Sequence, residues 1–225
     1  MQLNTIIGDI AEQAVDAIII NLFENTDSPG GATAAIDQRM NGAISALLIG
    51  GDFKGKLRET SVLYPGETMP ARRIIVVGLG LEEDFTIDRV RHATAAAAIR
   101  ARELGARRIA SILHGAGAGR IETYAAARAA AEGAGLGLYT FEKYKSEPGR
   151  QGVTSFTLVA WKEQNADALR AGAREGEIIA NCTCHARDLV SEPPNSCTPS
   201  FLASHAENIA HEHGMTAHVL SDAKV

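Results

Sequence analysis

Cysteines and long apolar runs are scarce in this chain of 225 residues. Its three cysteines, Cys182, Cys184 and Cys197, lie close together, and an odd, clustered set is not the disulfide framework of a small secreted protein. No run of about 18 apolar residues occurs, so we expect no transmembrane helix. The start, Met1 to Asn4, lacks the basic stretch and apolar run of a signal peptide. We therefore expect a cytoplasmic protein with no membrane partner.

Basic residues are also in the minority, because the formal net charge is −5. Proteins that bind nucleic acid usually carry a basic face, so the charge balance makes nucleic acid an unfavoured partner. Hydrophobic residues make up 45% and charged residues 22%, which is ordinary for a globular protein. The length is sufficient for one large domain, or for one domain and a fragment of another.

The first 160 residues alternate between two kinds of pattern. Short apolar runs rich in β-branched residues predict buried strands, and longer alanine-rich segments predict helices. The strands are expected at 15–22, 73–79, 108–113 and 154–159, and the helices at 32–49, 88–104 and 122–132. Strands separated by helices of this length favour crossover connections. The fold class expected is α/β, with a mixed, mostly parallel sheet flanked by helices in three layers.

The remainder of the chain predicts a loop at 141–152 and a long helix at 165–190, about 35–40 Å in length. Pro193 and Pro194 should end this helix. Thr198 is then expected to cap a new helix that Gly214 ends, and a strand is expected at 217–220. These elements are typical of the opening of a second α/β domain.

Two glycine-rich segments that follow strands are candidates for phosphate binding. Gly78-Leu79-Gly80 does not complete a dinucleotide-binding fingerprint, because Glu83 stands where the third glycine is required. The segment from His114 to Arg120, which includes the loop from Gly115 to Gly119, could cradle a phosphate at the start of the following helix. A tight turn is the favoured interpretation of that loop.

A cluster of cysteines and histidines is a candidate metal site. Its members are Cys182, Cys184, His185, Cys197, His205, His211 and His213. Zinc requires ligands that converge, and residues two apart on a helix point away from each other. Small buried cysteines and surface histidines are therefore the favoured interpretation. The polar segment Asn25–Gly31 is similarly interpreted as a surface loop rather than a catalytic one.

The chain resembles the leucyl (cytosol) aminopeptidase family over nearly its whole length. The similarity lies in residues 15–20, 51–56 and 73–80, and most specifically in Ala186-Arg187-Asp188-Leu189-Val190-Ser191-Glu192-Pro193-Pro194-Asn195 with Thr198-Pro199. The last stretch is similar to the opening of that family's catalytic domain. The resemblance implies a macro-like N-terminal domain at 1–162, a linker helix at 163–192 and the truncated start of a catalytic domain at 193–225.

A second resemblance is to macro domains, which bind ADP-ribose. Gly8-Asp9-Ile10 and the glycine loop after Ile109 carry it. Where macro domains have an asparagine-rich turn such as N-A-A-N, this chain reads Asn21-Leu22-Phe23-Glu24-Asn25. The alternative function is therefore a free-standing macro-like module that binds ADP-ribose or another nucleotide through the loop from Gly115 to Gly119.

The aminopeptidase resemblance implies an exopeptidase in which two divalent metals, zinc or manganese, activate water against the first peptide bond. The family's N-T-D-A-E-G-R and F-D-S-G-G motifs are absent from these 225 residues. We therefore expect no catalytic, cofactor-binding or metal-binding residue in this chain, and an inactive N-terminal part that serves assembly or regulation. The partners implied are the enzyme's own catalytic domain, peptides as its substrates, and further copies, since these enzymes are typically hexamers.

Overall fold

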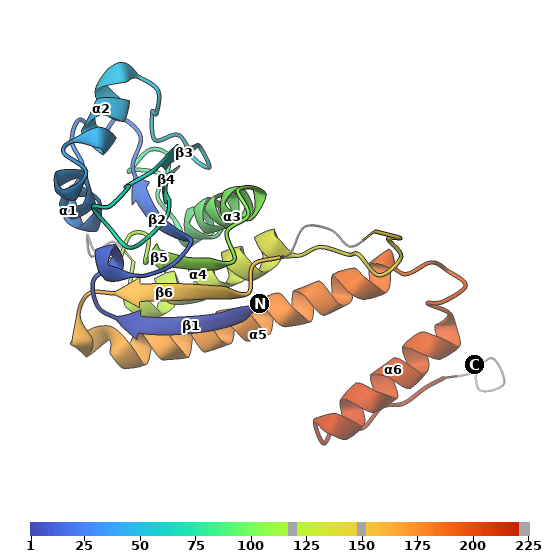
Figure 1. Ribbon diagram of the computed structural model, residues 1–225. Coiled ribbons are helices and arrows are strands. Elements are labelled where there is room, and N and C mark those ends of the chain that lie inside the picture. Colours follow the sequence, from blue (N-terminus) through green and yellow to red (C-terminus); the bar gives the residue numbers. More distant parts are fainter. Residues whose placement is uncertain (117–120, 148–151, 221–225) are drawn as a thin grey trace. The chain divides into compact units, whose positions relative to one another are not determined.

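The computed structural model describes residues 1–116, 121–147 and 152–220, and the chain divides into two compact units, 1–184 and 185–225. The first unit is built on a six-stranded sheet (Figure 1). In spatial order the strands are β1 (Gln2–Ile7), β6 (Ser155–Ala160), β5 (Arg108–Ile112), β2 (Ala17–Leu22), β4 (Ile74–Gly78) and β3 (Thr60–Leu63). Only β3 runs antiparallel to its neighbour.

The four expected strands are confirmed as β2, β4, β5 and β6, with ends that differ by one or two residues. The two strands that the sequence pattern missed, β1 and β3, lie at the edges of the sheet. Their residues are exposed or half-buried, whereas β4 is buried throughout. An edge strand has no continuous apolar run, so the pattern that identifies central strands does not apply to it.

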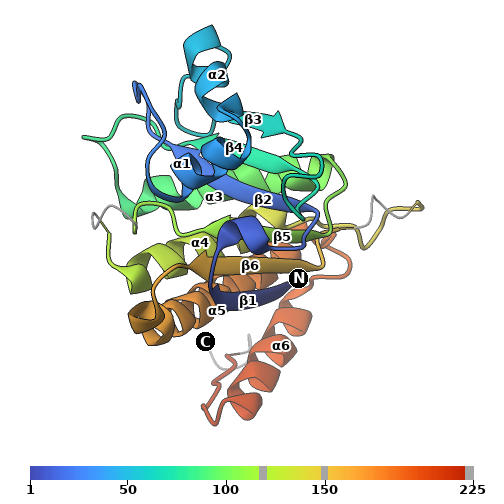
Figure 2. The same cartoon turned by 60° about the vertical axis from the view of Figure 1, so that its left-hand side comes forward.

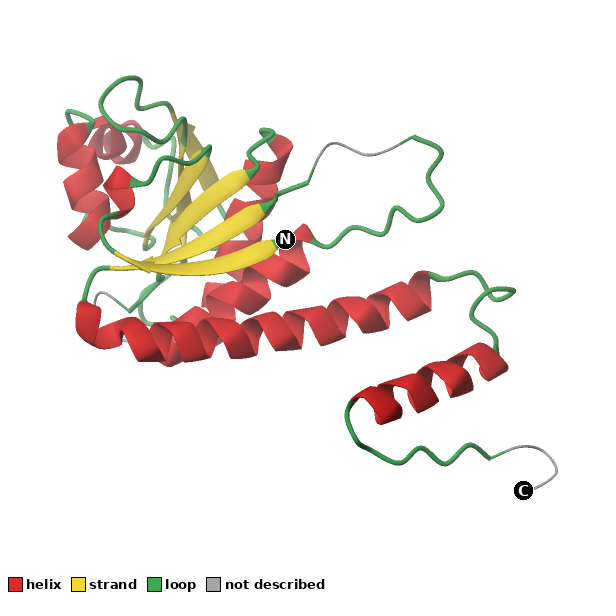
Figure 3. Cartoon of the chain, turned by 60° about the horizontal axis from the view of Figure 1, so that its bottom comes forward, coloured by secondary structure: helices red, strands yellow, loops and turns green. Residues whose placement is uncertain are grey.

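Helices cover both faces of the sheet, which confirms the three-layer arrangement (Figures 2 and 3). Successive side chains of β2 point to opposite faces, so Ile19 belongs to one core and Ile18 and Ile20 to another. The first core is completed by α3 (Ile87–Glu103), α4 (Thr123–Leu138) and the beginning of α5 (Ala166–Ser191). The second is completed by α1 (Gly31–Arg39), α2 (Ala43–Gly50) and the short helix η1 (Ile10–Glu12).

The single helix expected at 32–49 is wrong, because the chain forms α1 and α2 with a break between them. Asn41 and Gly42 have φ angles of 52° and 82°, in the left-handed region that ends a helix. The carboxylate of Asp37 then accepts hydrogen bonds from the amides of Ile44 (2.7 Å) and Ser45 (3.1 Å) in the first turn of α2. This side chain satisfies amides that the start of a helix leaves without partners.

The expectation that a helix ends before Gly133 is also wrong, because α4 continues to Leu138. Its glycines bring other helices close. A β-carbon on Gly135 would lie 2.7 Å from that of Ala180 in α5, and one on Gly137 would lie 2.9 Å from that of Ala95 in α3. The glycines are therefore required by helix packing and do not mark the end of the helix.

A network of charged side chains joins α3, α4 and α5. Glu132 is almost fully buried and is paired with Arg91 of α3. The Nε atom of Arg128 lies 3.3 Å from Glu132 Oε1 without hydrogen-bond geometry, and its Nη1 atom lies 3.1 Å from Glu175 Oε1 in α5. Tyr124 donates a hydrogen bond to Glu175. Burying Glu132 is tolerated because cations neutralise its charge.

The long helix is confirmed as α5, whose 26 residues span about 39 Å and end at Ser191, before the two prolines. Because α5 begins in the first unit and ends in the second, the boundaries at 162 and 192 stay a prediction. In the second unit, α6 (Pro199–Glu212) is capped by the Thr198 hydroxyl, which accepts a hydrogen bond from the Phe201 amide at 3.2 Å. Gly214 follows with a φ of 65°.

The strand expected at 217–220 is wrong, since these residues form no regular secondary structure and pair with no strand in the part of the chain that the structure describes. Val219 and Leu220 are exposed. A strand requires a neighbour for its backbone hydrogen bonds, so an apolar run alone does not form one. The loop expected at 141–152 is confirmed for 141–147 and 152, and its other residues lie outside the described ones.

Candidate functional site

The carboxyl edge of the parallel strands is the usual place for a ligand loop in an α/β fold. After β4, however, the backbone amides of Leu79 and Gly80 donate to the carbonyl oxygens of Leu22 and Gly55, both at 2.9 Å. A β-carbon on Gly78 would overlap the backbone of Gly55. Gly78 therefore allows close packing of backbone against backbone, and the two amides after β4 are already paired.

The other glycine loop follows β5. His114 is fully buried, and neither ring nitrogen has a hydrogen-bond partner among the described residues. Burial lowers the pKa of His114 to about 4, so the ring is neutral at pH 7. Gly115 follows with a φ of 80° and packs against the ring of Phe85, where a side chain would collide. Sequence reasoning named His114 only as the start of the glycine-rich segment and did not predict its burial, because a buried histidine gives no periodic signal.

The proposed phosphate-binding part of this loop, 117–120, lies outside the described residues. The helix that follows it, α4, has Glu122 at its N-cap, and this side chain makes no capping hydrogen bond. A carboxylate at a helix N-terminus occupies the region of positive potential that a phosphate would use. Binding of ADP-ribose at Gly115–Gly119 stays a prediction, and this carboxylate disfavours it.

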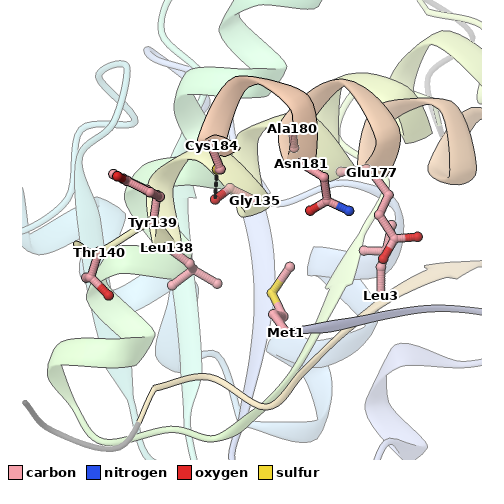
Figure 4. A pocket seen from close by; sticks show the side chains of 11 residues that line it. Met1, Leu3, Gly135, Leu138, Tyr139, Thr140, Glu177, Ala180, Asn181 and Cys184 are labelled. Carbon is pink, nitrogen blue, oxygen red and sulfur yellow. Dashed lines mark hydrogen bonds between the residues drawn. The ribbon is translucent and has the colours of Figure 1, made fainter. Parts of the chain in front are cut away.

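A cavity of about 280 Å³ lies between the start of β1, the end of α4 and α5 (Figure 4). Leu3, Leu138 and Ala180 supply apolar walls, while Glu177 and Asn181 come from successive turns of α5. The residues that line it are Met1, Leu3, Ala131, Gly135, Leu138, Tyr139, Thr140, Glu177, Ala180, Asn181 and Cys184. Sequence reasoning missed the cavity because three distant segments form it.

The side chains that line this cavity form neither of two common catalytic pairs. The thiol of Cys184 lies 3.8 Å from the carbonyl oxygen of Gly135, to which it donates a weak hydrogen bond. No histidine lines the cavity to activate that thiol, and Glu177 is its one carboxylate, so neither a thiol–imidazole pair nor a pair of carboxylates is present. The volume is just below the range typical of ligand pockets, roughly 300–1,000 Å³.

The seven cysteines and histidines singled out by sequence do not form one site. Cys182 is exposed on α5, Cys197 lies before α6, and His211 and His213 are exposed at the end of α6. In residues 1–116, 121–147 and 152–220, no group of three histidine, cysteine or acidic side chains is arranged to hold a metal ion. Two members nevertheless meet, since the Nε2 atoms of His185 and His205 are 2.5 Å apart.

The polar segment 25–31 joins β2 to α1. Asn25 has a φ of 59°, a left-handed conformation that asparagine tolerates in turns, and the segment is mostly exposed. Within the described residues, no helix is long and apolar enough to cross a membrane.

Comparison with known proteins places the chain in a family. Residues 19–148, more than half of the chain, match the N-terminal domain of the cytosol aminopeptidase family. The chain therefore belongs to the cytosol aminopeptidase family. It is 33% identical to a probable cytosol aminopeptidase of Alkaliphilus oremlandii over 98% of the chain and 44% of that relative. It is also 33% identical to the cytosol aminopeptidase of Pseudomonas aeruginosa over 87% of the chain and 40% of that relative.

Solved structures share the fold of the chain. A tomato leucine aminopeptidase mutant superposes with a TM-score of 0.83 at 23% identity, over 100% of the chain and 45% of that protein, and it shows the fold. The bottromycin maturation enzyme BotP gives a TM-score of 0.68 at 27% identity, over 93% of the chain and 40% of the enzyme. The chain thus spans less than half the length of these relatives and corresponds to the family's N-terminal domain, as the sequence resemblance implied.

Proposed function

We propose that this chain is the non-catalytic, assembly or regulatory N-terminal part of a metal-dependent leucyl aminopeptidase that removes N-terminal residues from peptides. The observation that carries the proposal is the match of residues 19–148 to the family's N-terminal domain, in a chain that spans 44% of a relative it matches over 98% of its own length. The family's N-T-D-A-E-G-R and F-D-S-G-G motifs are absent from these 225 residues.

The metals belong to the same proposal. A structure of the bottromycin maturation enzyme that resembles this chain is described as a complex with manganese. In the described part of this chain, no three potential ligands converge on a metal position. We infer that two divalent ions, zinc or manganese, are held by the catalytic domain of the whole enzyme, where they would activate water and polarise the peptide carbonyl.

Assembly of the enzyme is the expected role of the domain. Large apolar side chains remain exposed on α5 and α6, including Ile178, Val190, Phe201 and Leu202. Contiguous patches of such side chains mark surfaces that bind other protein, and we propose that these side chains contribute to one. We propose that the chain forms part of a homo-oligomer, such as a hexamer, in the cytoplasm. Within it the chain would contact the enzyme's own catalytic domain. Light scattering of the purified chain tests association: a clean monomer at high concentration would count against it.

The test of the function is peptidase activity. The purified 225-residue chain should not hydrolyse leucine p-nitroanilide above the buffer rate, with or without added manganese, while the Pseudomonas aeruginosa relative assayed in parallel serves as the positive control. A manganese-dependent rate that scales with the amount of chain, disappears with EDTA and survives repurification would overturn the proposal.

A further inference from the structure

Two histidines that are 20 residues apart in sequence meet in the second unit, 185–225. His185 lies near the end of α5 and His205 lies in the middle of α6. Their Nε2 atoms are 2.5 Å apart, their ring centroids are 4.7 Å apart and their ring planes are inclined at 29°. The ring of Phe201, one turn earlier on α6, lies nearly parallel to His205 at 5.9 Å. The imidazoles thus face each other through the same nitrogen.

A ring nitrogen of histidine can bind a metal ion as well as take part in a hydrogen bond. Neutral imidazole suits zinc, copper and nickel, and a zinc–nitrogen bond is about 2.0–2.1 Å long. In a tetrahedral site two such nitrogens are therefore about 3.3 Å apart. The His185 and His205 nitrogens are 2.5 Å apart, so a rotation that separates them by less than 1 Å would admit an ion.

We propose that His185 and His205 form a two-histidine site that binds a divalent transition-metal ion and joins α5 to α6. His185 is exposed and His205 is half-buried, so water can complete the coordination. No third histidine, cysteine or acidic side chain among the described residues completes the site. The ion is bound by two imidazoles, which makes the site weaker than a four-ligand structural zinc site.

Three features separate this site from the seven-residue cluster that the sequence indicated. The two ligands come from different helices, so the spacing that prevents neighbours on one helix from converging does not apply. Cys184, next to His185, directs its thiol to Gly135. His211 and His213 lie in the last turn of α6 and beyond it, about one and a half turns or more from His205.

Binding would stabilise the contact between the helices. The ion binds the folded arrangement, in which both nitrogens converge, and binds a separated pair less well, so it shifts the equilibrium toward the joined state. The chelate depends on two ligands held together, since the second imidazole binds at a high effective concentration. Loss of either histidine therefore removes most of the affinity. Because ligation requires neutral imidazole, binding also weakens in acid.

The experiment is calorimetric titration of the untagged 225-residue chain with zinc chloride at pH 7.5. The expected result is one equivalent bound, with at least about tenfold weaker affinity in both His185→Ala and His205→Ala. His213→Ala is the matched control, because it removes an exposed histidine near the end of the same helix, and it should leave the affinity unchanged. Substitution of all three cysteines by serine should also retain the zinc equivalent.

A second readout addresses variants that disturb the fold. Imidazole ¹⁵N spectra should show zinc shifting the Nε2 resonances of His185 and His205 and of no other histidine. Equal affinity in the chain and both alanine variants would overturn the proposal, as would loss of binding only when the cysteines are removed. The proposal would also be overturned if the chain bound no zinc at millimolar concentration and the spectra showed the two imidazoles hydrogen-bonded to each other. The pair would then form a hydrogen bond and no metal site.

Discussion

Gly133 of α4 lies directly against the backbone of Arg91 in α3: a β-carbon on Gly133 would be 2.5 Å from the Arg91 carbonyl oxygen. Backbone cannot move aside as the end of a long side chain can, so the two helices would have to separate. In an unobstructed helix, alanine is favoured over glycine by about 1 kcal/mol. Here the collision outweighs that preference, and the glycine is required for the packing of α3 on α4.

We predict that Gly133→Ala lowers the free energy of unfolding by about 2 kcal/mol, a typical cost of overpacking. Urea unfolding followed by circular dichroism measures the change. The matched control is Gly152→Ala, where a β-carbon has open space and the backbone is not left-handed, and it should change the free energy by less than about 0.5 kcal/mol. Equal effects of the two substitutions would contradict the packing argument.

The second prediction concerns the buried carboxylate of Glu132, whose side chain is 6% exposed. Glu132→Ala leaves Arg91 and Arg128 without their shared partner. Both arginines are partly exposed and keep another acidic partner, so we expect a loss of about 2 kcal/mol, typical of hydrogen bonds to a charged group. Thermal or urea unfolding measures the loss. Arg170→Ala is the control, because its ion pair with Asp167 is exposed and should contribute less than about 1 kcal/mol.

Burial of His114 predicts a dependence of stability on pH. Burial lowers the pKa of His114 to about 4 in the folded chain, against about 6.5 for an unfolded histidine. As the pH falls, the histidine therefore takes up its proton at a higher pH in the unfolded chain than in the folded chain. The stability contributed above pH 6.5 is lost progressively down to pH 4, by about 3 kcal/mol in total.

The variant His114→Leu removes this titration. Between pH 7 and pH 4, the free energy of unfolding should fall by about 3 kcal/mol less in the variant than in the unsubstituted chain. Denaturant titrations at several pH values measure the two slopes. Parallel curves for the chain and His114→Leu would refute the prediction.

The cap of α6 supports a local prediction. Thr198→Ala removes the hydroxyl that accepts the Phe201 amide, and loss of an N-cap costs about 1 kcal/mol of helix stability. Hydrogen exchange should therefore accelerate several-fold in the first turns of α6, while protection of the sheet stays the same. Ser204→Ala, an exposed position inside the helix, is the control and should not accelerate exchange.

The central strands and the long helices could be predicted from sequence because their signals are local. The apolar run at 74–78 is buried on both faces of the sheet, and Pro193 and Pro194 end α5 through their own backbone chemistry. The same local chemistry identified Thr198 as a cap and Gly214 as a helix end. The family resemblance was confirmed because it was carried by long matching segments of sequence.

Errors arose where a glycine or an apolar run has a meaning set by distant residues. Gly133 resembled a helix end, although its role is set by Arg91, 42 positions earlier in the sequence. The run at 217–220 resembled a strand but has no described partner. The cavity beside α5 requires three segments to meet, so no single stretch of sequence contains its signal.

By itself the sequence determined the α/β class, the central strands, the cap of α6, the ends of α5 and α6, and the family. Each of these depends on residues that are adjacent, or on whole segments that can be compared. Only the tertiary structure decided which glycines are packing positions, that His114 is buried and neutral, and that His185 faces His205. These properties arise from contacts between residues far apart in the chain, where burial and close approach determine the energies.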